Sequence, residues 1–326
     1  MFAEEQIRSE VAVMQCPLNL APVIVMDYIE HDMTLQDTLE DPSLDKKDSY
    51  RQIANILLEL SNLSFSTIGS LRQKTDGCGE VTGRPLSMPM NEIVRIGGVP
   101  ESDFPETPFR TASSYIDSLF DLHSSLVRNY PSKAYKDWRP FLVARALLKN
   151  RVQDILGLGT ENNGPFWLWC DDLTASNILV KEGQIVGIID WEYSYTAPSQ
   201  FTRVPPWWLI TQRPEHVKEI SSCSEVYEER LFLFLESLEQ VESKSVTKGL
   251  LSEDTRLSVS MRDGWESGRF WAVYAIRKPF FFDQVFWEFQ EELGGITGRW
   301  DSGLDLLDDK SREWMEEVVR QKELMR

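Results

Sequence analysis

The sequence predicts an α+β fold with a large, mainly helical part. Between residues 166 and 195, short apolar runs alternate with polar turns, as in a strand followed by a β-hairpin. Before and after that stretch, long segments carry apolar residues at helical spacing. With 326 residues, of which 42% are hydrophobic, the chain is long enough to bury a sizeable core.

Residues 1–26 are predicted to contain one helix and one strand, and residues 64–110 a long irregular region. Residues 4–15 carry Ile7, Val11 and Met14 at helical spacing, and residues 23–26 form an apolar run typical of a strand. Residues 64–110 are rich in Gly, Pro, Ser and Thr. Their glycines follow no predicted strand and open no predicted helix, so residues 74–83 are interpreted as a surface loop, not a phosphate-binding loop.

The remaining helices follow from the spacing of apolar residues. They are expected over 48–63, 111–127, 140–156, 225–242 and 310–325, with one or two more over the aromatic-rich stretch 257–292. His123 lies in one of them and is interpreted as a structural or surface imidazole, not a catalytic base. Trp207 and Trp208 follow a Pro-rich segment. They could line a substrate pocket, but core packing is the favoured interpretation.

The composition excludes several classes of partner. The formal net charge is −18, whereas nucleic acids and anionic membranes bind clustered Lys and Arg, so neither is expected. No apolar stretch is long enough for a membrane-spanning helix, and the N-terminus does not have the pattern of a signal peptide. The cysteines form no C-x-x-C pair, which favours free thiols in a reducing compartment such as the cytoplasm.

The stretch from Phe166 to Tyr195 carries the residues that indicate chemistry. A buried strand is expected over 166–169, and a hairpin over 178–189. Asp172 and Asn177 lie in the loop before the hairpin, and Asp190 directly follows it. Because the two ends of a hairpin lie side by side, we expect Asp172, Asn177 and Asp190 to converge.

Three oxygen-bearing side chains at one point suit a hard cation such as Mg²⁺. Protein-kinase-like enzymes use the same spacing, D-x-x-x-x-N and then an Asp after a hairpin, for phosphoryl transfer. One Asp positions the attacking hydroxyl and accepts its proton, while the Asn and the later Asp hold metal ions. The alternative is a hairpin with solvated polar loops, which fits any one of these residues taken alone.

These residues resemble the catalytic motifs of the aminoglycoside phosphotransferase family, which has a protein-kinase-like fold. That family usually shows H-G-D-L-x-x-x-N and then I-D-W-E. The matching residues here are C-D-D-L-T-A-S-N at 170–177 and I-D-W-E at 189–192. A fungal branch with the C-D-D variant also carries P-P-W-W-L and M-R-x-x-W-E-S-G-R-F-W, which match 205–209 and 261–271. The resemblance covers almost the whole chain.

The resemblance implies two parts and a set of functional residues. Residues 1–30 would be the remnant of an N-lobe, with a helix, a strand and a hinge, and residues 31–326 a helical C-lobe that contains the hairpin. Asp172 would be the catalytic base, and Asn177 and Asp190 would hold Mg²⁺ against ATP. The substrate would be a small molecule, and the fungal branch implies a role in secondary-metabolite biosynthesis.

For the nucleotide, the resemblance points to the N-terminal part. Glu10 matches the helix Glu that pairs with a nucleotide-binding Lys, with an exposed helix charge as the equal alternative. Asp27, Tyr28 and Ile29 match the hinge that meets an adenine, with a plain strand end and turn as the alternative. The nine residues before Glu10 contain neither the Gly-rich strand pair nor the Lys that the family places there, so a shortened N-lobe is expected, through natural truncation or an incomplete sequence.

Two further departures concern the catalytic loop. Cys170 replaces a His that supports the loop without transferring protons. Asp171 replaces a Gly and is expected either to disfavour the charged form of the neighbouring Asp172 or to contact the metal. Two functions stay open. One is an ATP- and Mg²⁺-dependent kinase for a small-molecule hydroxyl. The other is a catalytically altered, pseudokinase-type protein that binds or cyclises a small molecule.

Overall fold

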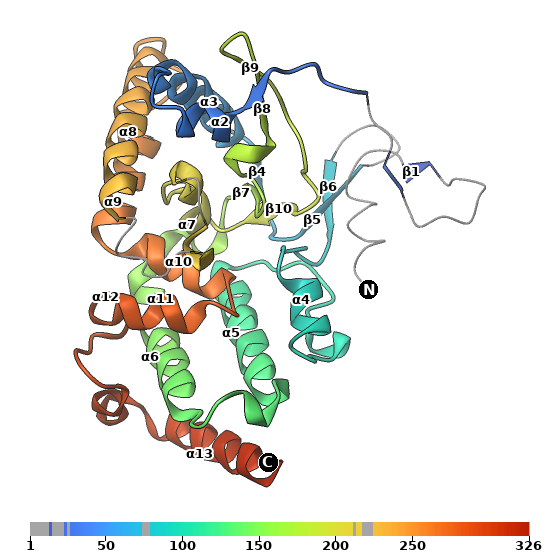
Figure 1. The fold of residues 1–326 in the computed structure, drawn as a ribbon, viewed down its shortest axis with the longest axis vertical. Helices are drawn as coiled ribbons and strands as arrows, with labels where there is room; N and C mark the ends of the chain where they lie inside the picture. The colour runs from blue at the N-terminus through green and yellow to red at the C-terminus, as the bar shows by residue number, and fades with distance from the viewer. Residues whose placement is uncertain are drawn as a thin grey trace.

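The computed structural model describes residues 13–14, 23–24, 27–73, 79–210, 213–216 and 224–325. The fold is mixed α/β, with many helices and several small antiparallel sheets (Figure 1). The helices are α2 (Leu35–Glu40), α3 (Lys46–Leu60), α4 (Met90–Arg95), α5 (Ala112–Asn129), α6 (Arg139–Leu156), α7 (Ser199–Thr202), α8 (Ser224–Thr247), α9 (Leu257–Glu266), α10 (Arg269–Arg277), α11 (Phe282–Glu288), α12 (Gln290–Gly294) and α13 (Asp309–Leu324). The strands are β1 (Val13–Met14), β2 (Val23–Ile24), β3 (Met33–Thr34), β4 (Ser64–Phe65), β5 (Ser70–Gln73), β6 (Gly79–Gly83), β7 (Phe166–Cys170), β8 (Ile178–Lys181), β9 (Gln184–Ile188) and β10 (Ser194–Ala197).

Local signals in the sequence explain the ends of the long helices. The Thr111 side chain caps α5 by accepting a hydrogen bond from the amide of Ser114. Pro140 stands in the first turn of α6, where it costs no hydrogen bond, and Gly157 ends that helix in the left-handed conformation. The apolar faces of these helices meet in one core, which includes Phe120, Leu142 and much of α10.

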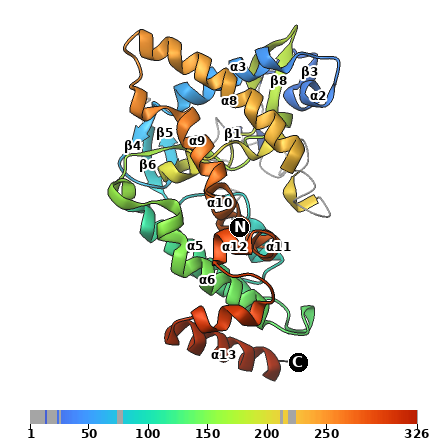
Figure 2. The ribbon, with the colours of Figure 1, turned by 90° about the vertical axis from the view of Figure 1, so that its left-hand side faces the viewer.

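The helices form two groups joined by the strands. α3 and α8 pack side by side at one end of the molecule, and α13 lies at the other end beyond α5 and α6 (Figures 1 and 2). The three-stranded sheet β10-β7-β4 lies between them, whereas the sheet β3-β8-β9 lies beside α2 and α3 (Figure 1). The 166–195 stretch thus contributes strands to both sheets.

Most of the predicted helices and the strands around the hairpin are confirmed. Helices expected over 48–63, 111–127, 140–156, 225–242 and 310–325 correspond to α3, α5, α6, α8 and α13. The stretch 257–292 was predicted as one or two helices and forms four, α9 to α12. Gly268, in the left-handed conformation, and Pro279 lie between successive helices of this region.

The interpretation of residues 74–83 as a surface loop is wrong for the residues that the structure describes. Gly79–Gly83 form strand β6, which pairs antiparallel with β5. A side chain at Gly69, next to β5, would collide with the backbone carbonyl of Gly83. Gly69 therefore lets the chain before β5 approach the backbone at the end of β6 closely.

Only part of the helix and the strand predicted near the N-terminus falls within the described residues. Val13 and Met14, expected at the end of a helix over 4–15, instead form β1 and pair with β2. The strand predicted over 23–26 is confirmed for Val23 and Ile24. The other residues of both predicted segments, and Glu10 with them, lie outside the described residues.

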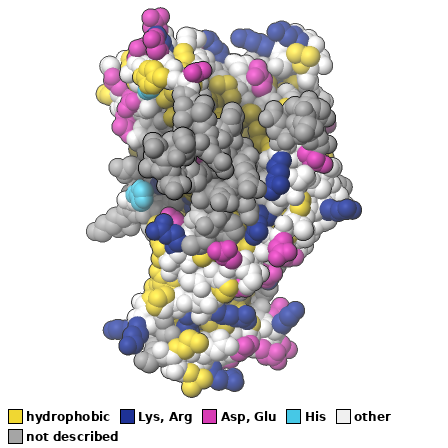
Figure 3. Space-filling model, turned by 90° about the vertical axis from the view of Figure 1, so that its right-hand side faces the viewer, with side chains coloured by type: hydrophobic (Ala, Val, Ile, Leu, Met, Phe, Trp, Pro, Cys, Tyr) yellow, Lys and Arg dark blue, Asp and Glu magenta, His cyan; other side chains and the backbone are white. Residues whose placement is uncertain are grey.

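Among the described residues, no helix is both long and apolar enough to cross a membrane. On the described part of the face drawn in Figure 3, Lys and Arg side chains lie among Asp and Glu side chains, and no single basic stripe is visible.

Candidate functional site

Hydrogen bonds between backbone groups bring the loop before the β8–β9 hairpin to the segment after it. β8 and β9 pair from Ile178–Ile188 to Lys181–Gln184. One step beyond this ladder, the amide of Ile189 donates to the carbonyl of Asn177 at 3.0 Å. Asn177 and Asp190, next to Ile189, therefore stand at the same open end of the hairpin.

The side chain of Asn177 ties this end to Asp172. Its Nδ2 atom donates to the backbone carbonyl of Asp172 at 3.0 Å, which leaves the amide oxygen of the half-buried side chain for another partner. The structure thus brings together the three residues that the spacing predicted to converge. Their chemical roles are a separate question.

Asp190 has an unusual backbone. Its φ is +60°, in the left-handed region that few residues other than Gly adopt. The residue is exposed, and its carbonyl accepts a weak hydrogen bond from the Cys170 thiol at 3.8 Å. A non-glycine residue in this conformation carries some strain, and such strain concentrates at functional sites.

The carboxylate of Asp172 forms an ion pair that the sequence did not reveal. Nη2 of Arg213 donates to Oδ1 of Asp172 at 2.7 Å, and both side chains are mostly buried, with exposures of 23% and 19%. The guanidinium also lies over the Trp207 ring, 5.1 Å from its centroid, and against the sulfur of Met88. Arg213 is 41 positions from Asp172, and no local pattern marked it.

Asp171 does not contribute to the open end of the hairpin. Its side chain is 3% exposed and accepts hydrogen bonds from Nε and Nη2 of Arg277, from the Trp169 indole and from the Met88 amide. Burial disfavours the charged form of Arg277 and by itself lowers its pKa. The Asp171 carboxylate favours the charged form, and the net result is a raised pKa of Arg277. The expectation that Asp171 influences the base or the metal is therefore corrected: it anchors the loop to α10.

A negative field surrounds the open end. The pKa of Glu192 is raised by partial burial and by the charges of Asp190 and Asp172. Burial, with the charges of Glu192 and Asp172, raises the pKa of Tyr193 to about 12. Carboxylates that repel one another in this way are stabilised by a cation, and carboxylate and amide oxygens are the donors that Mg²⁺ prefers.

The set of oxygen donors therefore fits Mg²⁺ in kind. Asn177 and Asp190 supply an amide oxygen and a carboxylate, which is enough for an ion that keeps several waters or phosphate oxygens. Among the residues described, no group of three His, Cys, Asp or Glu side chains that could hold a metal ion is found. A closed metal cage of such side chains is thus not seen in that part of the chain.

Cys170 and His123 are structural. Burial raises the pKa of the Cys170 thiol to about 11, so it stays neutral beside the loop, as expected for a residue that transfers no protons. His123 is 2% exposed, its Nε2 atom hydrogen-bonds to the carbonyl of Ile276 at 2.9 Å, and burial lowers its pKa to about 3. Neither group can serve as a base at neutral pH at the hairpin end.

Of the three residues predicted to form a hinge, Ile29 contacts the hairpin in the structure. Ile29 packs on Gly187 of β9, where an added side chain would come within 2.8 Å of the Ile29 Cδ1 atom. Asp27 and Tyr28 are exposed, Tyr28 to 78%. The structure thus places Ile29 on the hairpin but leaves the Asp27 and Tyr28 side chains in solvent.

Comparisons with known proteins give no further assignment. A scan against protein-family models, a search of the curated proteins and a search of the solved structures each found no match.

Proposed function

We propose that the chain is a protein of the aminoglycoside phosphotransferase type that transfers a phosphoryl group from ATP to the hydroxyl of a small molecule. A kinase-like fold is part of this proposal, with residues 1–30 as the remnant of an N-lobe and 31–326 as the C-lobe. The observation that supports it best is the pair of hydrogen bonds that link Asn177 to Asp172 and to Ile189, because they assemble Asp172, Asn177 and Asp190 at one point.

Each of the three residues has a role in the proposal. The Asp172 carboxylate accepts a hydrogen bond from the acceptor hydroxyl, orients it and takes its proton as it attacks the phosphoryl group. Asn177 and Asp190 would hold Mg²⁺, which supplies positive charge to the phosphate oxygens. Glu192, with its raised pKa beside Asp190, adds to the field that attracts the cation.

Arg213 imposes a condition on this role. Its guanidinium donates to Oδ1 of Asp172, so an acceptor hydroxyl has either to displace Arg213 or to bind the other carboxylate oxygen. A carboxylate has about four acceptor positions on its two oxygens, which leaves room for both. Arg213 would then orient the base as well as restrain it.

The same ion pair favours a second candidate function. The Asp172 carboxylate is already paired with Arg213 and is less free to take up a proton, which fits the pseudokinase-type protein that binds or cyclises a small molecule. Under this alternative, Arg213 and Asp172 form a fixed wall of a binding site, and their exposures of 23% and 19% fit such a wall.

Turnover distinguishes the two functions. Formation of ADP from ATP and Mg²⁺ is measured with a panel of small alcohols, for wild type, Asp172→Asn and a control Asp305→Asn at an exposed position in the turn 300–306. The proposal predicts alcohol-dependent ADP formation that falls at least 100-fold in Asp172→Asn and is unchanged in the control. Alcohol binding without ADP formation would favour the second candidate.

A further inference from the structure

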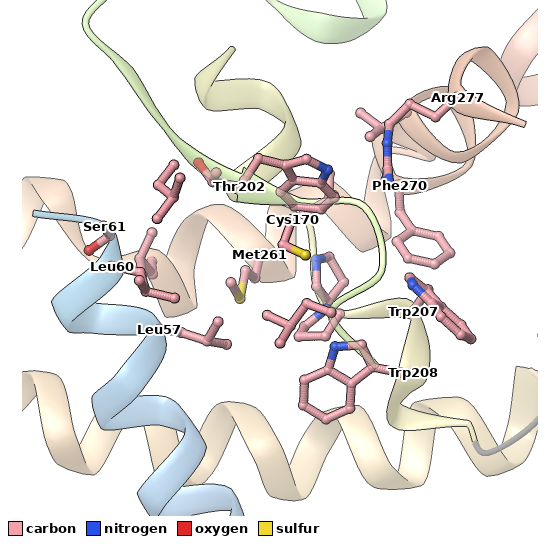
Figure 4. A pocket seen from close by; sticks show the side chains of 18 of the residues that line it. Leu57, Leu60, Ser61, Cys170, Thr202, Trp207, Trp208, Met261, Phe270 and Arg277 are labelled. Carbon is pink, nitrogen blue, oxygen red and sulfur yellow. The ribbon is translucent and has the colours of Figure 1, made fainter. Parts of the chain in front are cut away.

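An apolar cavity of about 80 Å³ lies directly behind the candidate site. Leu57 and Leu60 reach into it from α3, while Trp207 and Trp208 approach from the opposite side of the view in Figure 4, with Cys170 between them. α9 and α10 complete the wall through residues such as Met261 and Phe270. The cavity therefore lies where the helices meet the catalytic strand β7.

The wall of this cavity is mostly apolar, and several of its polar groups already have hydrogen-bond or ion-pair partners. Of the four indole N–H groups in the wall, those of Trp169 and Trp191 already donate, to Asp171 and to the carbonyl of Ile188. The Thr202 hydroxyl donates to Ser199, and the Arg277 guanidinium is neutralised by Asp171. Among the described residues that line the cavity, none is Asp, Glu or Lys. A wall of this composition favours an apolar occupant.

The cavity adjoins the proposed base. Cys170, two residues before Asp172, and Leu173, directly after it, both line the cavity, as does Trp191, which follows Asp190. Leu173, Trp191 and Trp207 are half-buried, so this part of the cavity wall lies near the surface. There, Arg213 lies over the Trp207 ring and holds the Asp172 carboxylate, and it thereby joins the mouth of the cavity to the base.

We propose that this cavity binds the apolar group of the acceptor substrate, whose hydroxyl then lies at Asp172. The substrate class is a small alcohol with a compact alkyl group, not a polycationic sugar. An apolar cavity of about 150 Å³ admits benzene, so one of about 80 Å³ takes an alkyl group of roughly three or four carbons and excludes a six-membered ring. The hydroxyl's role rests on the proposed function, but occupation of the cavity does not.

Binding of simple alcohols to the full chain tests the proposal without any phosphoryl transfer. Ethanol, 1-propanol, 2-methyl-1-propanol and cyclohexanol are titrated while tryptophan fluorescence is recorded. Burial of each further methylene is expected to tighten binding about fourfold up to four carbons, and cyclohexanol is expected to bind more weakly than 2-methyl-1-propanol. Equal affinity for all alcohols, or affinity that still rises for the ring, would overturn the proposal.

Two variants and one control locate the binding. Val273→Leu fills part of the cavity from α10 and is expected to weaken 2-methyl-1-propanol binding at least fivefold. Met261→Ala enlarges it and is expected to bind cyclohexanol at least fivefold more tightly than wild type. Val285→Leu changes an equally buried valine in α11 that does not line the cavity, and should leave both affinities unchanged.

The outcomes separate this proposal from the proposed function. If the alcohols bind as predicted but never stimulate ADP formation, the cavity proposal holds and the phosphotransferase proposal fails. If ADP formation depends on Asp172 but neither Val273→Leu nor Met261→Ala changes alcohol affinity, the reverse follows. If Val273→Leu does not fold, Met261→Ala still tests the proposal, because a gain of cyclohexanol binding cannot arise from instability.

Discussion

The guanidinium of Arg213 bridges the carboxylate of Asp172, at 2.7 Å, and the ring of Trp207, at 5.1 Å. This contact couples the proposed base to the mouth of the apolar cavity. It also places a positive charge next to the oxygen donors at the open end of the hairpin. The charge on Arg213 should therefore oppose the binding of any cation at that end.

Arg213→Ala is expected to increase the affinity of the protein for Mn²⁺, used as a probe for Mg²⁺, by roughly three- to tenfold, since it removes a nearby positive charge. Mn²⁺ binding is measured by calorimetry or by water-proton relaxation. Arg299→Ala, which removes a charge from an exposed pair with Asp301, is the control and should have no effect. Unchanged or weaker Mn²⁺ binding in Arg213→Ala would show that no cation site lies beside Asp172.

Asp171→Asn is expected to lower the free energy of unfolding by about 3–5 kcal/mol, because it leaves Arg277 buried and uncompensated. Urea unfolding measures the loss. Asp172→Asn, whose partner Arg213 is more exposed, is the matched control and should cost about 1 kcal/mol. The double replacement Asp171→Asn with Arg277→Met should recover most of the loss. Equal costs for Asp171→Asn and Asp172→Asn would contradict the anchoring role of Asp171.

Asp190→Gly is expected to raise the free energy of unfolding by about 0.5–1 kcal/mol and to abolish metal binding, since Gly adopts a positive φ without strain. The comparison with Asp190→Ala isolates the backbone effect, because both variants lose the carboxylate. Glu182→Gly, at another residue with positive φ, should give the same gain without loss of metal binding. A destabilised Asp190→Gly would argue that the carboxylate serves stability.

The stability of the protein should fall as the pH drops below about 6.5, in part through His123. Its folded-state pKa of about 3 lies below the unfolded value, so between these two values only the unfolded chain takes up the proton. This costs about 1.4 kcal/mol per pH unit below 6.5. His123→Gln should remove that part of the slope in urea unfolding at pH 5–7, whereas His216→Gln, at an exposed position, should not. An unchanged slope in His123→Gln would mean that His123 is charged in the folded protein.

The sequence was informative where structure is determined locally. α3, α5, α6, α8 and α13 carry apolar residues at helical spacing, and the hairpin β8–β9 is a pair of apolar runs around the turn residues Glu182 and Gly183. The positions of Asp172, Asn177 and Asp190 followed from that hairpin. Their juxtaposition could be predicted because a hairpin places its two ends side by side.

Contacts between distant segments could not be predicted in this way. Arg277 lies 106 positions from Asp171, and Arg213 lies 41 positions from Asp172, with no spacing rule that connects them. The strand β6 was missed because it begins and ends on glycines, which are depleted in strands, yet Gly79–Gly83 pair with β5. Ile7, Val11 and Met14 have the spacing of a helix, yet Val13 and Met14 pair with Ile24 and Val23 and form a strand.

Calorimetry of ATP with Mg²⁺, on wild type and Asp190→Ala, tests the central claim most directly. If Asn177 and Asp190 hold the metal beside Asp172, the wild type binds ATP in a Mg²⁺-dependent manner, and Asp190→Ala loses at least tenfold in affinity. The control Asp305→Ala should bind as the wild type does. No binding by the wild type at millimolar ATP, or equal binding by wild type and Asp190→Ala, would contradict the proposed phosphotransferase site.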